Sequence, residues 1–474
     1  MKKRAELKDD VFLQEHQQRV LDKLKTDVAG LILVHGLGSG KTLSSIAAAE
    51  ELGFDADVVV PASLRENYRK EIAKFTEGDS KDYSLKSYNE VASNEFALSP
   101  KEKQLLILDE AHRLRERSTK ATKAIEGSSP SYNKRLLLTG TPIINRPDDL
   151  VALLNIVSGD SSLNSEKFKE DFIAHKRVSP GFFARLMGVK DGSIPVVKNP
   201  NKFKKKFSRF FDFHGGSTDE FPEVEEEKIQ VEMDPLQQEI YDGLLDKNPI
   251  LAYKVRKNLP PSKTESRQLN AFLSAVRQVS NTPVGFSKKE LDINNAPKLK
   301  SIADRVIESY KKDPKNKSVV YSNYLSSGVE PIADSLEREG IPYAIFDGSL
   351  NDKKRKEIID AYNSDKINTL LVSGAGSEGL DLKGTRSLHV TEPHWNDARI
   401  RQMIGRAARF RSHSHLPKED RKLNVFKYQS KPKRSFFQRL FGSKVTGTDE
   451  YLEELSRQKD ELNNQFLDLI KGEK

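Results

Sequence analysis

Short runs of apolar residues alternate with helical patterns over the first 150 residues of the chain. The segments 11–26 and 42–52 place apolar residues at helical spacing, and Gly53 suits the position just after a helix. Four short, mostly apolar runs are typical of buried strands, at 31–34, 57–60, 105–108 and 135–138. Continuous apolar strands separated by helices indicate a parallel sheet covered by helices on both faces.

The same alternation returns after about residue 297. Five further strands are predicted there, at 318–321, 343–346, 369–372, 388–391 and 424–428. Between the two regions the chain is richer in helix formers and charge, with Pro-Gly and Gly-Gly breaks and an acidic stretch at 223–227. We therefore predict an α/β protein with two parallel-sheet lobes and a mostly helical insertion between them.

These patterns suggest four segments. Residues 1–150 form the first lobe, 151–290 the helical insertion and connector, and 291–448 the second lobe. The tail from 449 to 474 has helical periodicity over 449–469. It either packs on the second lobe or serves as a helix for a protein partner, and we expect packing.

Composition narrows the protein class. A length of 474 residues fits two or three domains, and the chain has no cysteine, which excludes disulfides and thiolate chemistry and fits a reducing, cytoplasmic setting. No apolar run approaches the roughly 18 residues of a membrane span, and no secretory signal is evident. The net charge of +9 favours polyanionic partners. Basic clusters at 202–207, 353–356 and 431–434 either grip phosphates or are solvated.

The first chemical motif is LILVHGLGSGKT, where a predicted strand meets a predicted helix. It contains three glycines at alternating positions, Gly36, Gly38 and Gly40. Glycines let the backbone wrap a phosphate, and the N–H groups point inward at the helix N-terminus. Lys41 can neutralise the β- and γ-phosphates, and the Thr42 hydroxyl can bind magnesium. The strict spacing has glycine at position 35, where this chain has His35.

Two further motifs follow strands of the same lobe. LLILDEAH places Asp109 and Glu110 at the carboxyl end of a strand, where ligands of open α/β sheets bind. Asp109 suits magnesium, and Glu110 suits the orientation and deprotonation of an attacking water. His112 could sense the γ-phosphate or link to another motif. In LLLTGTP, Thr139 and Thr141 either couple nucleotide state to DNA grip or simply cap a turn.

The second lobe contributes a glycine-rich loop and an arginine motif. The loop SGAGSEGLDL, at 373–382, is flexible enough to contact a nucleotide and a nucleic-acid backbone. In QMIGRAAR, Arg406 and Arg409 are three residues apart, which places them on one face of a predicted helix. Such arginines can stabilise charge on a transferring phosphoryl group, although a basic helix surface would look the same.

The ordered set GSGKT, DEAH, TGTP, SGAGSEGLDL and QMIGRAAR resembles the superfamily 2 helicases, and more narrowly the Swi/Snf-type DNA-dependent ATPases. EPHWND at 392–397 is similar to the tryptophan-containing segment of that group, and 231–241 and 296–304 are similar to its connector. The run IGRAARFRSHSHLP resembles the viral and phage branch, which includes poxvirus nucleoside triphosphate phosphohydrolases. Nearly the whole chain is covered except much of 150–220.

The resemblance implies two RecA-like lobes with ATP and Mg²⁺ between them. It places Gln17 at an adenine contact, with Gln18 as the alternative, and Gln402, Arg406 and Arg409 at the family's glutamine and arginine-finger positions. Within the glycine-rich loop, Gly379 and Asp381 are the expected nucleotide contacts. The expected nucleic-acid contacts follow strands of both lobes or belong to the tryptophan segment, and are Ser63, Asn323, Ser373 and Trp395.

The function implied is a DNA-dependent ATPase that moves along DNA, gripping phosphates without reading bases. Strand separation or remodelling of DNA-bound complexes stays open. The alternatives are an RNA helicase, because DEAH occurs there too, and an ATPase switch subunit of a transcription or packaging complex. A protein partner would bind through the helical insertion or the C-terminal helix. If the chain is viral, the host cytoplasm or the virion is the expected location.

Overall fold

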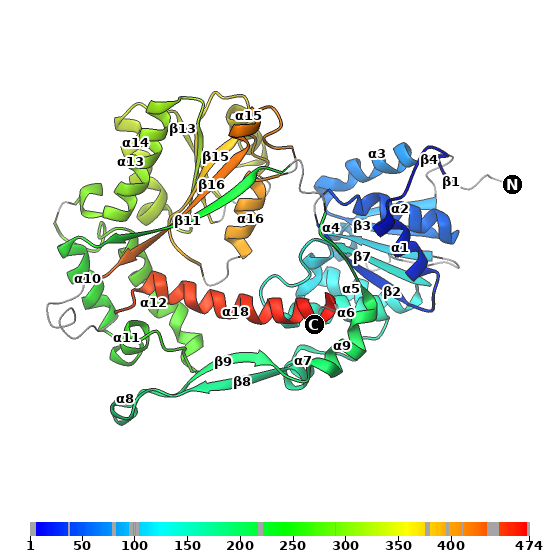
Figure 1. Cartoon of the computed structure of the whole chain (residues 1–474), viewed down its shortest axis with the longest axis horizontal. Coiled ribbons are helices and arrows are strands. Elements are labelled where there is room, and N and C mark those ends of the chain that lie inside the picture. Colours follow the sequence, from blue (N-terminus) through cyan, green and yellow to red (C-terminus); the bar gives the residue numbers. More distant parts are fainter. Residues whose placement is uncertain are drawn as a thin grey trace. The chain divides into compact units, whose positions relative to one another are not determined.

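The computed structural model describes residues 6–36, 38–77, 82–93, 98, 100, 104–216, 221–262, 264–289, 291–374, 380–394, 398–409, 411–433 and 445–471. The chain divides into two compact units (Figure 1). The first unit comprises residues 1–174, 195–218 and 461–474, and the second comprises 175–194 and 219–460. Each unit contains one six-stranded sheet.

The sheet of the first unit is parallel throughout, in the order β10-β2-β7-β6-β3-β5. Its strands are β2 (Gly30–His35), β3 (Asp55–Val60), β5 (Tyr83–Ser87), β6 (Gln104–Asp109), β7 (Lys134–Thr139) and β10 (Phe211–His214). A small antiparallel pair, β1 (Glu6–Leu7) with β4 (Thr76–Glu77), lies in the same unit. Strands β2, β7 and β6 are neighbours, so their carboxyl ends meet at one edge of the sheet.

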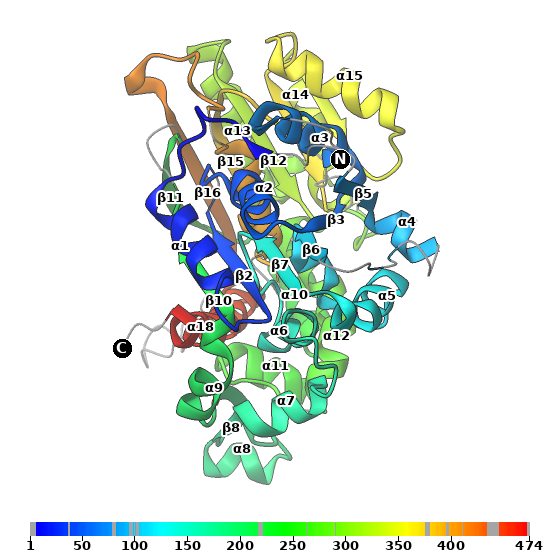
Figure 2. The ribbon, with the colours of Figure 1, turned by 90° about the vertical axis from the view of Figure 1, so that its right-hand side faces the viewer.

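Helices cover both faces of this sheet (Figures 1 and 2). Leu31, Leu33 and Ile107 point to one face, which is packed by α1 (Glu15–Leu24), α2 (Lys41–Leu52) and α3 (Arg65–Phe75). Ile32 and Leu106 point to the other face. The helices there are α4 (Tyr88–Ser93), α5 (Lys120–Ser128), α6 (Leu150–Ser158), α7 (Ser165–Phe172), α9 (Pro200–Phe207) and the end of α18 (Thr448–Lys471). Burial on both faces explains why these strands are continuously apolar.

The sheet of the second unit is also entirely parallel, in the order β11-β16-β15-β12-β14-β13. Its strands are β11 (Glu223–Glu232), β12 (Lys317–Ser322), β13 (Tyr343–Phe346), β14 (Thr369–Ser373), β15 (Thr385–Val390) and β16 (Lys422–Lys431). Helices α15 (Asp352–Asn363) and α16 (Ala398–Ala407) pack with one face, and α13 (Pro297–Lys312) and α14 (Glu330–Arg338) with the other. The predicted α/β class with two parallel-sheet lobes is therefore confirmed.

Two strands of the six-stranded sheets come from the segment in which the sequence predicts mostly helix. β10 adds a short edge strand beside β2, and the acidic run 223–227 forms part of the edge strand β11. Alternating hydrophobicity is absent from β11 because its side chains are mostly exposed. Lysines of β16 compensate its charge, since Lys422 Nζ lies 2.9 Å from a Glu223 carboxylate oxygen and Lys427 Nζ lies 2.7 Å from one of Glu226.

The other elements of the middle segment are helical, apart from one hairpin. Helices α10 (Pro235–Leu245), α11 (Pro249–Arg256) and α12 (Glu265–Asn281) share an apolar cluster with the beginning of α18. The tail is thus a helix, as its periodicity predicts, and its beginning packs in the second unit. The hairpin consists of β8 (Ile173–Val178) and β9 (Gly192–Val197), with the short helix α8 (Phe182–Leu186) between them. Across the described ranges, no helix has the length and apolar character needed to cross a membrane.

Candidate functional site

The glycine-rich loop between β2 and α2 has a backbone that only glycine adopts easily. Gly38 and Gly40 have φ angles of 74° and 71°, in the left-handed region. A Cβ on Gly36 would lie 2.1 Å from the carbonyl oxygen of Gly215, so this position has no room for a side chain. The loop therefore leads directly into the N-terminus of α2, where backbone N–H groups favour a phosphate.

Lys41 begins α2 and turns back over the loop. Its Nζ donates to the carbonyl oxygens of His35 at 2.9 Å and Gly36 at 3.0 Å. Burial lowers the pKa of Lys41, while the carboxylates of Glu110 and Asp109 oppose that shift. Thr42 follows in the first turn and is half-buried. The two predicted phosphate and magnesium ligands of this motif are thus adjacent to the loop.

The carboxylates of the DEAH motif lie where β6 ends. Asp109 is the last residue of β6, and burial together with the neighbouring Glu110 raises its pKa to about 6. Glu110 has φ 52° and ψ 46°, a left-handed conformation that is uncommon outside glycine. Strained backbone of this kind occurs often at active sites. Because of this turn, the carboxylates of Asp109 and Glu110 do not follow the alternation of side-chain directions that they would have if β6 continued.

His112 connects the DEAH motif to the TGTP motif. Its Nδ1 lies 3.2 Å from the hydroxyl oxygen of Thr139, at the end of β7, and 3.3 Å from a carboxylate oxygen of Glu110. Burial lowers the pKa of His112, against the effect of Glu110. The hydroxyl of Thr139 also accepts the backbone N–H of Thr141 at 3.1 Å. Hydrogen bonds therefore connect the three predicted coupling residues, and His112 also lies next to the predicted base.

Gln17 is the better placed of the two glutamines considered for adenine. It is 3 % exposed and lies against the loop, with its Nε2 3.4 Å from the carbonyl oxygen of Gly40. Gln18 is exposed and bonds to Asp22 on its own helix. The contact between Gln17 and adenine remains a prediction.

His35, the departure from the phosphate-loop pattern, belongs to a buried ionic network. Its Nε2 lies 2.8 Å from Asp212 Oδ1, and both side chains are fully buried. Arg19 binds both carboxylate oxygens of Asp212 at 2.9 Å, and Lys23 Nζ lies 2.7 Å away. Burial opposes ionisation of Asp212, but the hydrogen bonds from His35, Arg19 and Lys23 outweigh it and hold its pKa well below the usual range. Sequence reasoning missed this network, because Asp212 lies 177 residues from His35.

Two more histidines extend this network toward the loop. The rings of His16 and His214 stack with centroids 3.6 Å apart, and each lies edge-on to His35 at 5.5 and 5.8 Å. His16 Nε2 lies 2.8 Å from the carbonyl oxygen of Ser39 in the loop. The edge strand β10, which supplies Asp212 and His214, thus packs beside the residues that hold the glycine-rich loop.

The residues predicted to bind magnesium carry suitable donors. Thr42 and Asp109 supply a hydroxyl and a carboxylate oxygen, both hard ligands of the kind that Mg²⁺ takes. Over the described residues, no group of three His, Asp or Glu side chains could hold a metal by itself.

The arginine motif lies in the second unit and differs from the prediction in one detail. Helix α16 ends at Ala407, so Arg406 is in its last turn but Arg409 is beyond its end. The helix stops before the second arginine, which forms an ion pair with Asp381 at 2.9 Å. Arg406 donates to the carbonyl oxygen of Leu380 at 3.5 Å, and Gln402 is exposed. Arg406, Arg409 and Asp381 therefore lie in the same unit. The prediction that the two arginines share one helix face was wrong, because the helix ends before Arg409.

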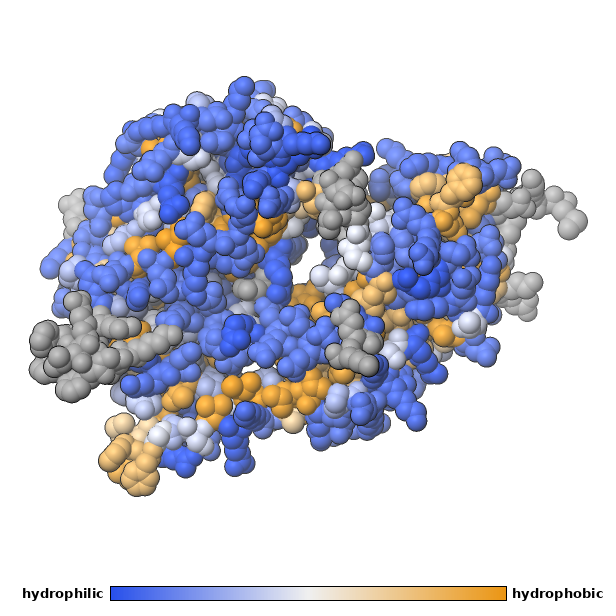
Figure 3. All heavy atoms as spheres, in the orientation of Figure 1, coloured by the Kyte–Doolittle hydropathy of each residue, from blue (hydrophilic) through white to orange (hydrophobic). Residues whose placement is uncertain are grey.

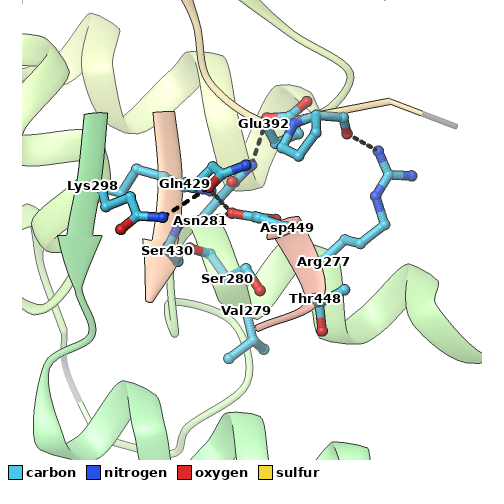
Figure 4. A network of polar contacts seen from close by, with 12 residues as sticks. Arg277, Val279, Ser280, Asn281, Lys298, Glu392, Gln429, Ser430, Thr448 and Asp449 are labelled. Atoms are coloured by element: carbon cyan, nitrogen blue, oxygen red, sulfur yellow. Dashed lines mark hydrogen bonds and ion pairs between the residues drawn. The ribbon is translucent and has the colours of Figure 1, made fainter. Parts of the chain in front are cut away.

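The end of the second sheet has a buried cluster around Glu392 (Figure 4). This carboxylate is 1 % exposed and accepts from the backbone and side chain of Asn323 at 2.5 and 2.9 Å. It also accepts from the Ser322 hydroxyl at 3.0 Å and from Asn281 Nδ2 at 2.9 Å. Arg277 of the same helix α12 donates to the carbonyl oxygen of Pro393 at 3.1 Å. Glu392 thereby fixes Asn323, a predicted nucleic-acid contact, to α12.

A second buried contact in Figure 4 fixes the beginning of α18. Lys298 Nζ lies 2.7 Å from Asp449 Oδ2, with side chains 1 % and 0 % exposed. The same oxygen accepts the backbone N–H of Ser430 at 2.9 Å. The C-terminal helix is therefore joined to α13 by a desolvated ion pair and to β16 by a hydrogen bond.

The remaining predicted nucleic-acid contacts have different positions. Ser63 is exposed in the short turn Ala62–Leu64 after β3. Ser373 is 3 % exposed, so a contact from this position would come from the loop that follows it. Gly379 and Trp395 lie outside the described residues. None of these contacts is tested by the geometry.

Comparison with known proteins gives a consistent result. Residues 67–284 match the SNF2-related domain, and residues 298–411 match the helicase conserved C-terminal domain. A candidate ATP-dependent RNA helicase of Acanthamoeba polyphaga mimivirus is 30% identical over 98% of this chain and 97% of that protein. A termination factor NPH-I homolog of African swine fever virus is 25% identical over 93% of this chain and 75% of that protein.

Among solved structures, the SWI2/SNF2 ATPase core of Sulfolobus solfataricus in complex with dsDNA is 19% identical. That alignment covers 95% of this chain and 96% of the other, with a TM-score of 0.36. The two domain matches and the viral relatives indicate a nucleic-acid-dependent ATPase. The chain belongs to the SNF2-related helicase family, on its viral NPH-I-like side.

Proposed function

We propose that the protein is a DNA-dependent ATPase that converts ATP hydrolysis into movement along DNA. The observation that carries the proposal is the convergence of chemistry at the ends of three neighbouring strands. The loop after β2 supplies Lys41, β6 supplies Asp109 and Glu110, and β7 supplies Thr139. Such an edge is where ligands of open α/β sheets bind.

Each residue has a role in this proposal. The loop backbone and Lys41 hold the β- and γ-phosphates, and Thr42 and Asp109 hold Mg²⁺, which neutralises charge on the phosphates. Glu110 orients the attacking water and takes its proton. Gln17 contacts adenine. His112 and the threonines then report the state of the site, because His112 touches both Glu110 and Thr139.

The second unit supplies the remaining parts of the proposed site. Arg406 and Arg409 stabilise charge on the γ-phosphate during transfer, and Gln402 and the 373–382 loop contribute further nucleotide contacts. In the present structure Arg409 is paired with the exposed carboxylate of Asp381 at 2.9 Å. We propose that phosphate competes with Asp381 for this guanidinium, so that hydrolysis depends on a change of partner.

The preference for DNA rests on the SNF2-related match and on the EPHWND segment. Asn323, Ser63 and the loop after Ser373 are the proposed phosphate contacts. Because phosphate contacts carry no base information, binding is expected to be indifferent to sequence and to weaken with salt. The basic balance of the chain, +9, agrees with this.

A second candidate comes from the relatives' names. The mimivirus relative is named as a candidate RNA helicase, and the African swine fever virus relative as a termination factor homolog. An RNA-stimulated ATPase, or an ATPase that acts within a transcription complex in host cytoplasm or virion, would fit those names. A third-strand displacement assay separates the readings. ATP-dependent release of a third strand from duplex DNA supports the proposal. Release of a strand from RNA duplexes, without release from DNA, supports the second candidate.

A further inference from the structure

The hairpin of the middle segment ends in an exposed apolar surface. Helix α8, between β8 and β9, and the residue that follows it carry four large apolar side chains in water, and we name them together the hairpin tip. They are Phe182, Phe183, Leu186 and Met187, with exposed fractions of 76%, 78%, 78% and 64%. In Figure 3 they form the apolar patch at the lower left. Exposed patches of this kind commonly mark interaction sites.

The tip is oriented rather than loosely attached. Ala184 and Val189 are buried on the opposite side, and the Val189 N–H donates to the carbonyl oxygen of Ala184 at 3.0 Å. At the base, a Cβ on Gly192 would lie 2.2 Å from the Pro260 carbonyl oxygen, and Ser193 N–H donates to the Pro261 carbonyl oxygen at 3.3 Å. The backbone of β9 is therefore packed closely against the chain that precedes α12. These contacts fix the position of the hairpin base and therefore of the tip.

The chemistry of the tip fits unpaired bases. The rings of Phe182 and Phe183 are edge-on to one another, with centroids 5.7 Å apart and planes at 79°, so their faces point in different directions. An exposed aromatic face stacks with any base, because every base has a π-surface. Each ring could therefore stack with a different base that has left the duplex stack.

The charge around the tip fits the same ligand. Residues 173–197 contain four cations, Lys176, Arg177, Arg185 and Lys190, and one carboxylate, Asp191. Asp191 lies 3.5 Å from Arg185, while Lys176 and Arg177 are exposed on β8. Cations beside stacking aromatics are the combination used to bind single strands. A purely apolar protein partner would provide no negative charge to complement these cations.

We propose that the hairpin tip binds unpaired nucleotides of the nucleic acid, stacking bases on Phe182 and Phe183 while Lys176 and Arg177 contact phosphates. This inference rests on the nucleic-acid dependence proposed above and adds a second point of contact, which distinguishes a strand with unpaired bases from a continuous duplex. The site reads no sequence, because stacking and phosphate contacts are both insensitive to base identity.

The test compares a blunt DNA duplex with the same duplex carrying an unpaired thymidine tail. Three double variants are measured by fluorescence anisotropy: Phe182→Ala with Phe183→Ala, the matched pair of Leu substitutions, and the matched pair of Trp substitutions. Leu keeps the apolar surface but removes the aromatic face, whereas Trp keeps the face. Stimulation of ATP hydrolysis by the blunt duplex is measured in parallel for every protein.

The wild type and the Trp variant should bind the tailed duplex about tenfold or more tightly than the blunt one, and the Ala and Leu variants should lose that difference, since a stacked base contributes of that order. Blunt-duplex stimulation should be equal in all four. A Leu variant that retains the tail preference would overturn stacking as the source of that preference. An Ala variant with unchanged preference would also overturn the proposal. If the blunt duplex did not stimulate ATP hydrolysis by the wild type, the proposed DNA-dependent function would be contradicted instead.

Discussion

His35 and Asp212 form a buried pair directly behind the glycine-rich loop, with His35 Nε2 2.8 Å from Asp212 Oδ1 and neither side chain exposed. A histidine stands where the phosphate-loop pattern has glycine because its side chain points away from the loop and into this pair. Asp212 lies in β10, which pairs in parallel with β2 and places His214 opposite His35. The loop is thus supported by an edge strand from much later in the chain.

Replacing Asp212 tests this support. Asp212→Ala should reduce the free energy of unfolding by about 3 kcal/mol, because it leaves buried His35 without its acidic partner and removes the carboxylate that pairs with Arg19 and Lys23. Asp22→Ala is the matched control, since Asp22 is exposed on the same helix α1 as Arg19. Thermal unfolding measures the effect. Equal stability of the two variants would show that the network does not support the first unit.

Lys41→Ala and Glu110→Gln should both abolish turnover, for different reasons. Lys41→Ala removes a phosphate ligand and should weaken ATP binding. Glu110→Gln keeps the shape and should still bind ATP, while hydrolysis falls by about 10²–10⁴-fold with the loss of a positioned base. Binding of a fluorescent ATP analogue and single-turnover hydrolysis distinguish the two. Substantial hydrolysis by Glu110→Gln would reject the role assigned to this carboxylate.

Arg406→Ala and Arg409→Ala should each impair hydrolysis more than ATP binding. An arginine that stabilises transferring charge contributes roughly 10³-fold or more to the rate. Arg401→Ala is the control, because Arg401 lies on the same helix and pairs with Asp460 at 2.8 Å. Steady-state hydrolysis with saturating DNA is the measurement. Normal rates in both variants would show that the motif does not act on the nucleotide.

His389 should make the second unit sensitive to acid. Burial, helped by the charge of Arg305, lowers its pKa to about 3, so the folded protein keeps it neutral where the unfolded chain binds a proton. As pH falls below about 6.5, the free energy of unfolding should fall by about 1.4 kcal/mol per pH unit from this group. His389→Gln should remove that slope, whereas replacing the exposed His175 should not.

Hydrogen exchange of amides in β15 and β16, measured at about pH 6.5 and about pH 5, reports this slope. A His389→Gln variant with the pH dependence of the wild type would mean that His389 is protonated in the folded state. The hydrogen bonds from its ring to Tyr428 and Ser387, at 3.0 and 3.2 Å, would then need a different assignment.

The parts of the fold that the sequence predicts are those with strong local signals. The strand at 105–108 is fully buried and the strand at 31–34 is buried except at Val34, so their apolar runs are unbroken, and the glycine-rich loop and DEAH follow them directly. Of the edge strands of the two six-stranded sheets, β5, β10 and β11 were missed because each contains polar residues, whereas β13 was predicted because its run YAIF is nearly all apolar. β11 is mostly acidic and is held by lysines of β16, a cross-strand relationship that no local window contains.

The candidate site follows the same division. Lys41, Asp109 and Glu110 could be found because each motif directly follows a strand. Asp212 and Glu392 could not, since each acts on residues far away in the chain, His35 and Asn323. A buried acid next to an apolar run is the only local signal they offer, and it is weak. The end of α16 before Arg409 was missed for another reason, because nothing in QMIGRAAR marks a helix stop.

The most direct test of DNA dependence is the rate of ATP hydrolysis measured in parallel without nucleic acid, with duplex DNA, with single-stranded DNA and with RNA. Glu110→Gln serves as the blank for contaminating ATPases. We expect hydrolysis to rise about tenfold or more with DNA, to be indifferent to its sequence, and to respond weakly to RNA. Strong stimulation by RNA with none by DNA would contradict the proposed function and favour an RNA-dependent ATPase.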